Sequence, residues 1–233
     1  LEASGVATRV FGWPGSWGDD PSLQSFPGDE TGAALEPAIR ASLEAALDGL
    51  PERRAQIWSA IMRDQARVEV AVDALEEDAA DVWIHLEALS MARRYHEPLR
   101  PRHTRRRLFL ELMMELVDEQ LGMLLGATSD DDLVAVVSPF GLAPPGSFER
   151  LKRTFGGGES WHTSADASPD GLFILLGSGA NPGRRVSPVR PPDVAPTLCY
   201  LLGLPVAQYM EGSVVVGMVT PSFLEQHPLR VVD

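Results

Sequence analysis

Apolar residues follow two periodicities along the chain, and together these predict helices alternating with strands. Apolar positions at helical spacing predict helices over residues 34–50, 52–79 and 104–125. Two short apolar runs, at 133–137 and 172–176, have no polar interruption, which is typical of strands buried on both faces of a parallel sheet. These five segments already indicate an α/β arrangement.

Weaker signals fill in the rest of the pattern. Residues 8–11 and 81–86 are predicted to be strands, and a short helix follows the second of them as far as Tyr95. A helix over 193–202 is expected to be capped by Asp193 and to end at Gly203, since glycine favours the left-handed conformation that closes many helices.

Length and composition fit one α/β domain covering residues 1–233, with 18–50 as a possible insertion or cap region. The formal net charge of −13 argues against a general nucleic-acid surface, because phosphate binding needs clustered Lys and Arg. The basic segment 100–107 is an exception, which either holds a local anionic partner or is a solvated helix start. No apolar run approaches the roughly 20 residues that a membrane span needs.

Six segments, in this order, resemble the type I phosphodiesterase/nucleotide pyrophosphatase family of the alkaline phosphatase superfamily. They cover about 200 residues of the chain and are Phe11–Trp17, Ala80–Glu87 with Ala92–Pro98, Leu116–Leu125, Asp131–Ser138 with Gly141, Ser168–Leu175, and Pro192–Pro205 with Met210–Gly212.

The resemblance implies a three-layer α/β/α sandwich with a mostly parallel sheet. It also implies a site in which two metal ions, usually zinc, are held by Asp and His and activate a Thr or Ser nucleophile. In the family, the first Asp ligand and the nucleophile precede the segment that matches Phe11, so the N-terminal strand and nucleophile segment are expected to be missing here.

At the family's metal motifs this chain carries other residues. Where the family has Ser-Asp-His-Gly, Pro139 and Phe140 stand at the Asp and His positions. Where it has Asp-x-x-x-His, the alignment places Leu86 and Ser90, and the last metal His aligns with Ala167. None of these side chains replaces a carboxylate or an imidazole.

Three nearby residues are weaker candidates for rescuing the metal site. Glu87 lies one residue from the expected Asp position, and His162 and Asp166 lie close to Ala167. No Gly-x-Ser-x-Gly elbow suggests another nucleophile. The only cysteine, Cys199, falls within an apolar helix and is expected to be an inert core residue.

These substitutions predict a non-catalytic structural or interaction subunit, with no cofactor and with other protein chains as partners. The alternatives are a metal-dependent phosphodiesterase or phosphatase with unusual ligands, zinc among them, and a ligand-binding module without hydrolysis. The compartment stays open, an extracytoplasmic location included.

Two structural expectations follow from the alignment. The segment 138–141 and Ala167 should meet at the carboxyl ends of neighbouring strands, where the family's metals lie. A doubly covered parallel sheet also requires near-complete burial of its apolar strand residues and of the helix that covers it. The residues expected to be buried in this way are Val134, Val136, Phe173, Leu175 and Leu201.

Overall fold

The computed structural model of the chain describes residues 8–12, 37–47, 51–77, 81–96, 104–139, 141, 169–186 and 188–232. Its internal contacts divide the chain into two compact units, each built from two segments. Unit 1 contains Leu1–Thr128 and Pro144–Thr163, and unit 2 contains Ser129–Ala143 and Ser164–Asp233. Each unit is described by itself.

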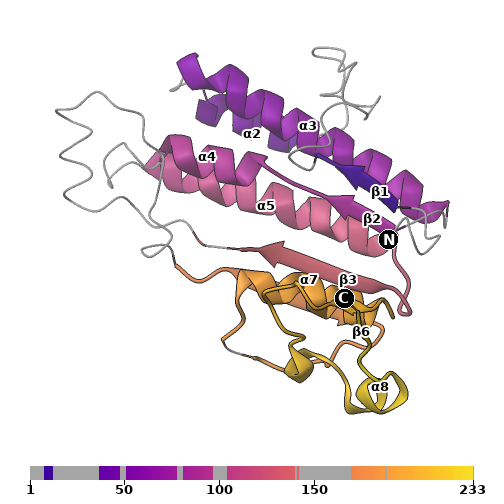
Figure 1. The fold of residues 1–233 in the computed structure, drawn as a ribbon. Coiled ribbons are helices and arrows are strands. Elements are labelled where there is room, and N and C mark those ends of the chain that lie inside the picture. Colours follow the sequence, from indigo (N-terminus) through magenta and orange to yellow (C-terminus); the bar gives the residue numbers. More distant parts are fainter. Residues whose placement is uncertain are drawn as a thin grey trace, which may run out of the picture. The chain divides into compact units, whose positions relative to one another are not determined.

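The described residues of unit 1 form a short parallel strand pair and four helices (Figure 1). Strand β1 (Thr8–Phe11) pairs in parallel with β2 (Asp81–Ile84), with Thr8 opposite Asp81. Parallel strands need a crossover between them, and here two helices intervene in the chain. The helices of the unit are α2 (Pro37–Leu47), α3 (Pro51–Glu76), α4 (Ala88–His96) and α5 (Thr104–Gly126).

The core of unit 1 lies between these helices. Aliphatic and aromatic side chains with almost no exposed surface make up its centre, and its largest members are Leu43, Ile57, Ile61, Phe109, Met113 and Leu116. Leu43 comes from α2, so the helical part of the expected insertion region contributes to this core. Burying each such side chain favours folding by about 1.5–3 kcal/mol, which explains why the helical periodicity is so regular here.

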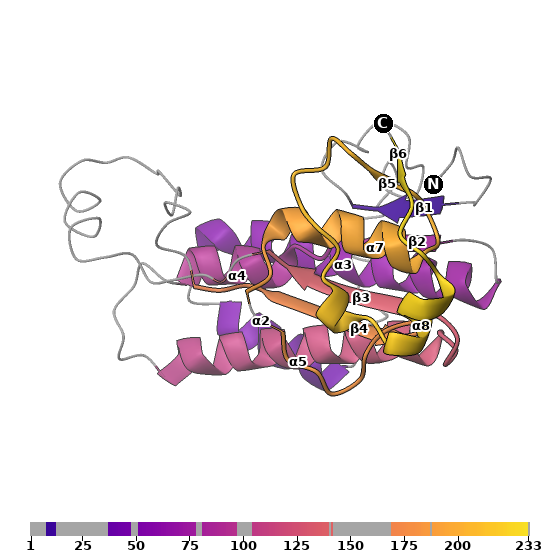
Figure 2. The ribbon, with the colours of Figure 1, turned by 60° about the horizontal axis from the view of Figure 1, so that its bottom comes forward.

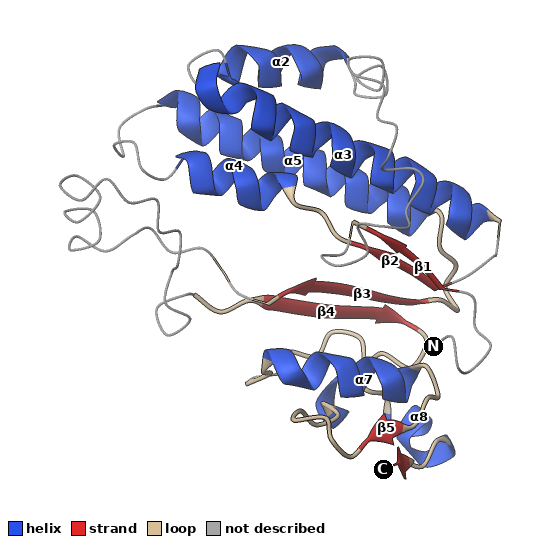
Figure 3. Ribbon diagram, turned by 45° about the horizontal axis from the view of Figure 1, so that its top comes forward, coloured by secondary structure: helices blue, strands red, loops and turns tan. Residues whose placement is uncertain are grey.

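Unit 2 is built around a two-stranded antiparallel sheet (Figure 3). Strand β3 (Leu133–Ser138) pairs with β4 (Leu172–Gly177). The rest of the unit consists of η4 (Pro191–Asp193), α7 (Val194–Leu201), β5 (Val206–Ala207), η5 (Val216–Met218), α8 (Pro221–Gln226) and β6 (Val231–Val232). Strands β5 and β6 pair in parallel.

The helices and strands predicted from periodicity are confirmed, with boundaries within a few residues. The described residues therefore form a mixed α/β structure with small sheets, two parallel and one antiparallel. None of the helices among the described residues is both long and apolar enough to span a membrane.

The expected setting of the two apolar strands, β3 and β4, is wrong. They pair with each other in antiparallel fashion, and the sheet that they form is not buried on both faces. Leu133 and Leu175 share one face and pack against the cluster that contains residues of α7. Figure 2 shows α7 beside the β3–β4 pair. Ile174 and Leu176 lie on the other face and are 37% and 43% exposed.

Burial of the five named residues follows from this arrangement. Leu201 is buried, as expected, with 8% of its surface exposed. Val134, Val136, Phe173 and Leu175 are only half-buried. Val134 and Val136 lie on the face of the sheet that α7 does not cover within unit 2, together with the exposed Ile174 and Leu176. A continuous apolar run therefore predicted the strands correctly and their surroundings incorrectly.

Helix α7 was predicted to be capped by Asp193 and to end at Gly203, and only its end matches the expectation. Gly203 has φ +69°, its N–H donates to the Tyr200 carbonyl, and the Leu204 N–H donates to the Cys199 carbonyl at 2.8 Å. This pair of bonds is the Schellman motif, so the role predicted for Gly203 is confirmed.

Asp193 stands at the N-cap position, but its carboxylate does not cap α7. It instead accepts from the backbone N–H groups of Arg190 and Ser213, each at 2.9 Å, and from the Arg190 guanidinium. In the first turn of the helix, the Thr197 hydroxyl donates to the Asp193 carbonyl and accepts from the Val215 N–H, which ties α7 to the chain around Val215. The carboxylate thus joins two loops, which corrects the capping role predicted for it.

Replacing Gly203 should destabilise unit 2. We expect Gly203→Ala to lower the free energy of unfolding by about 1 kcal/mol, because a Cβ is disfavoured at positive φ. Gly203→Asn should cost less, since asparagine tolerates the left-handed region. Urea unfolding followed through the amide exchange of α7 measures both, and equal losses for the two variants would contradict this role of Gly203.

Candidate functional site

The carboxyl ends of β1 and β2 form the candidate site, because open α/β folds bind ligands where parallel strands end. β1 ends at Phe11 and Gly12, and β2 leads into His85, Leu86 and Glu87. The His85 N–H donates to the Phe11 carbonyl at 2.9 Å, and the His85 Nδ1 atom lies 3.2 Å from the Gly12 carbonyl oxygen. These contacts keep the two chain segments side by side beyond the last paired residues.

A buried carboxylate from α3 satisfies the start of α4 at this strand end. Asp64 is 1% exposed, and its Oδ2 atom accepts from the backbone N–H groups of Glu87, at 2.8 Å, and Ala88, at 2.7 Å. The first N–H groups of a helix have no partner within the helix, so they need an acceptor from elsewhere. Asp64 provides it from a different element, and so ties α3 to α4.

Arg67 completes this buried connection. Its Nη1 atom donates to the Asp64 Oδ1 atom at 3.0 Å and to the His85 carbonyl at 3.2 Å. Its Nε atom is buried and, among the described residues, has no hydrogen-bond partner. The guanidinium lies directly against Gly12, where an added Cβ would come within 2.4 Å of the Nε atom. Gly12 also has φ +71°, so glycine is required at this position twice over.

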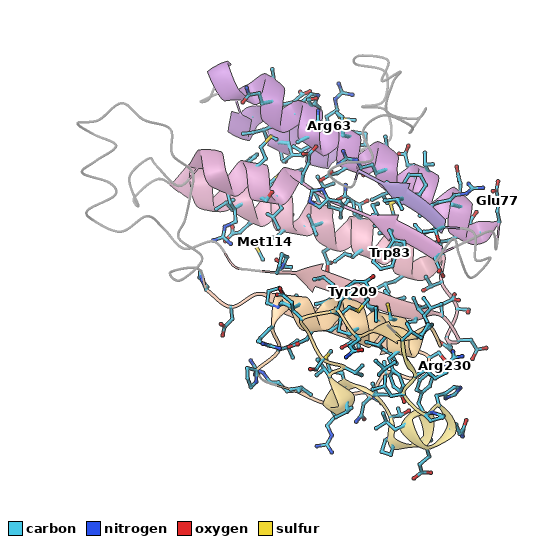
Figure 4. All side chains as sticks on the ribbon, in the orientation of Figure 1. Arg63, Glu77, Trp83, Met114, Tyr209 and Arg230 are labelled. Carbon is cyan, nitrogen blue, oxygen red and sulfur yellow. The ribbon has the colours of Figure 1, made fainter. Side chains whose placement is uncertain are left out.

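Glu87, which sequence reasoning considered as a substitute metal ligand, is engaged in ion pairs. Arg63, labelled on α3 in Figure 4, donates to its Oε1 atom through Nη2 at 2.8 Å and Nε at 2.9 Å. Arg67 approaches the same oxygen at 3.5 Å. The carboxylate is 22% exposed and faces two guanidinium groups, whose positive charges disfavour a metal cation beside it.

The other two positions of this motif have structural surroundings. Leu86 is half-buried in the connection between β2 and α4. Ser90 is exposed in the first turn of α4, and its hydroxyl donates to the Glu87 carbonyl at 2.9 Å. Leu86, Glu87 and Ser90 thus lie close together after β2, as their spacing in the sequence requires. The positive charges next to them belong to the side chains of Arg63 and Arg67.

The second group of predicted site residues, between positions 139 and 167, is only partly described. Pro139 is exposed just after β3, whereas Phe140, His162, Asp166 and Ala167 lie outside the described residues. The expected meeting of 138–141 with Ala167 therefore stays a prediction.

The nearest described contact to that expected meeting joins two neighbouring segments. The Gly141 N–H donates to the Pro169 carbonyl at 2.8 Å. The end of β3 thus lies beside the chain that leads into β4.

Sequence reasoning missed the residues that dominate the site, Asp64, Arg63 and Arg67. A signal for Asp64 was present, because it lies three residues after Ile61 and four before Val68, on the apolar stripe of α3. A charged residue on a buried stripe needs a partner, and Arg67 lies one turn further on. Their common partners on β2 and α4 could not be read from spacing alone.

Burial raises the pKa of Asp64 to about 6, although the Ala88 N–H, the Arg67 guanidinium and the Glu87 N–H all act in the opposite direction. In unit 2 the pKa of Asp193 moves the other way. The hydrogen bond from the Arg190 side chain, followed by the N–H groups of Ser213 and Arg190, lowers it to about 2. The dominant cause therefore differs between the two carboxylates: desolvation outweighs the hydrogen bonds at Asp64, whereas the Arg190 hydrogen bond outweighs desolvation at Asp193.

Within the part of the chain that the structure describes, no cluster of three or more His, Cys, Asp or Glu side chains converges in a way that could hold a metal ion. Comparison with known proteins finds no matching family model, no matching curated protein and no matching solved structure.

Removing the buried carboxylate should destabilise unit 1 strongly. We expect Asp64→Ala to lower the free energy of unfolding by about 3 kcal/mol, because Arg67 would remain buried without its main partner. Arg9→Ala is the matched control, since its pair with Glu77 is exposed and such pairs contribute less than about 1 kcal/mol. Chemical unfolding followed through the amides of α4 measures both, and similar losses for the two variants would contradict the role of Asp64.

The two units should respond to acid in opposite ways. The stability that protonated Asp64 gives unit 1 is fully present below its ordinary pKa of 3.8 and is lost as the pH rises through about 6. The stability that ionised Asp193 gives unit 2 is present above 3.8 and is lost as the pH falls towards 2. Hydrogen exchange of α4 and α7 across this pH range, corrected for intrinsic rates, measures both, and an unchanged α4 profile in Asp64→Asn would refute the assignment to Asp64.

Proposed function

We propose that this chain is a degenerate phosphodiesterase-like protein, of the alkaline phosphatase type, that acts as a non-catalytic structural or interaction subunit. In this proposal its fold is a three-layer α/β/α sandwich and its partners are other protein chains. The order of six resembling segments supports the family assignment, and the mixed α/β structure with a parallel β1–β2 pair is compatible with it.

The ion pairing of Glu87 is the observation that carries the proposal. A two-metal site requires unpaired carboxylates and neutral imidazoles that converge on a cation. Glu87 is the acidic side chain closest to the expected ligand position, and its oxygen is held by Arg63 at 2.8 Å with Arg67 at 3.5 Å. Binding a divalent ion there would require breaking this pair and placing a cation beside two positive charges.

The Asp64 carboxylate is committed in the same way. Its two oxygens accept three hydrogen bonds in all, from the Glu87 and Ala88 N–H groups and from Arg67. Freeing it for another ligand would leave the start of α4 without an acceptor. Both carboxylates thus have structural partners. This supports the proposal that the residues at this strand end stabilise the fold and do not take part in phosphoryl transfer.

Exposed apolar surface supports an interaction role. One face of the β3–β4 sheet leaves adjacent aliphatic side chains exposed, namely Leu172, Ile174 and Leu176, at 37–52% of their surface. Isolated apolar residues are ordinary on protein surfaces, but adjacent ones on one small sheet are typical of an interaction site.

The test is an activity measurement on the protein with aryl phosphate mono- and diesters, in the presence of added zinc or manganese. We expect no metal-dependent turnover with either ester class, because the transition-state charge would have no metal ion to stabilise it. Equilibrium dialysis with zinc gives an independent readout, and we expect no stoichiometric binding.

His162→Ala is the informative variant for the alternative of an active enzyme with unusual ligands. Metal-dependent turnover that this substitution abolishes would overturn the proposal. His227→Ala serves as the matched control, since His227 stacks on Phe223 in unit 2 at 4.1 Å between ring centroids and has no expected metal role.

A further inference from the structure

A shallow groove of about 370 Å³ runs along β4 in unit 2. One wall is formed by Phe173–Gly177, and the other by residues 180–184 together with Met218. Every residue from Phe173 to Gly177 lines it, although successive residues of a strand point to opposite faces of the sheet. A groove that receives residues of both faces must follow the edge of the strand, so it lies beside the backbone of β4.

This edge of β4 has no strand partner among the described residues, since β3 occupies the other side. The Ser178 N–H donates to the Asp132 carbonyl, which fixes the alternation of hydrogen bonds along the antiparallel pair. By this alternation Leu172, Ile174 and Leu176 bond to β3. Phe173 and Leu175 therefore direct their backbone N–H and C=O groups into the groove, at the spacing that another strand would use.

The charge at the groove indicates what kind of strand would fit. Arg184 is its only charged lining residue, is exposed, and makes no ion pair within the described parts of the chain. The protein as a whole carries a net charge of −13, so an unpaired cation at this position is a local exception. The neighbouring Ile174 and Leu176 are aliphatic and partly exposed. The complementary ligand is an extended segment with aliphatic side chains and a carboxylate.

We propose that the edge of β4 binds an extended acidic segment of a partner protein, which adds to the β3–β4 sheet as a further strand. Main-chain hydrogen bonds to Phe173 and Leu175 would provide affinity, and the Arg184 guanidinium would select for the acidic residue. This inference rests on the proposed function as an interaction subunit and specifies the surface that is used.

The probe is a terminally blocked peptide of about eight residues that alternates valine and glutamate, compared with the same peptide carrying lysine for glutamate. We expect the glutamate peptide to slow hydrogen exchange at the Phe173 and Leu175 amides, and the lysine peptide to leave both unchanged. Exchange at Leu172, Ile174 and Leu176 should change little, because these amides already bond to β3. Protection of all five amides alike, or of none, would overturn the proposal.

Two charge reversals test the role of arginine. Arg184→Glu should weaken binding of the glutamate peptide about tenfold, since an attractive pair becomes a repulsive one. Arg185→Glu is the matched control, because Arg185 is adjacent and exposed but does not line the groove, and it should weaken binding by less than about threefold. Equal effects of the two reversals would contradict a specific role for Arg184.

Two further outcomes would change which molecule is assigned to the groove. Concentration-dependent dimers in sedimentation, with protection of the same amides in the absence of peptide, would replace the partner segment by a second copy of this chain. Failure of the peptide to bind would refute the strand addition and leave the non-catalytic assignment standing. Metal-dependent phosphoester turnover would overturn that assignment, whether or not the peptide binds.

Discussion

The buried pair between Asp64 and Arg67 is the interaction on which the organisation of unit 1 depends. It connects α3 to the start of α4 through the Glu87 and Ala88 amides, and to the end of β2 through the His85 carbonyl. Burying two opposite charges is itself costly, and the attraction between them offsets this cost only when the remaining polar atoms are satisfied. The Asp64 carboxylate meets this condition fully, whereas the Nε atom of Arg67 does not.

The pair also dictates what surrounds it. Gly12 must lack a side chain because the Arg67 guanidinium lies where a Cβ would be. Glu87 joins the same network through Arg63 and Arg67, and it directly precedes α4. Positive charge from α3 therefore fills the end of a parallel strand pair, a place where α/β proteins commonly bind ligands.

Sequence patterns predicted the elements well, because periodicity reflects which side chains each helix or strand must bury. They did not predict strand direction, since Leu133–Ser138 and Leu172–Gly177 contain the same kinds of residues as strands of a parallel sheet. An apolar run shows that its side chains favour burial, but it does not show which helix or strand will pack against them. For this reason the partial exposure of Val134 and Phe173 could not be predicted from the sequence pattern.

The candidate site was predictable in its location but not in its chemistry. The strand that leads to this site followed from the apolar pattern, whereas Leu86 and Glu87 became candidates through the family resemblance; the structure describes both residues just after β2. The role of Asp193 was misjudged because its residue type suits a cap, whereas its actual partners, Arg190 and Ser213, include one twenty residues away. Long-range hydrogen bonds of this kind leave no periodic trace in a single sequence.

The pairing of β1 with β2 has a consequence for the order of events at the ribosome. Both α2 and α3 are synthesised between these two strands, so β1 leaves the exit tunnel long before its partner exists. Until β2 follows, Val10 and its neighbours are an unpaired extended segment, open to other chains or to chaperones. Helix α3 is synthesised before β2, so Asp64 and Arg67 are already present in the chain when the His85 carbonyl and the Glu87 and Ala88 N–H groups that they bind emerge.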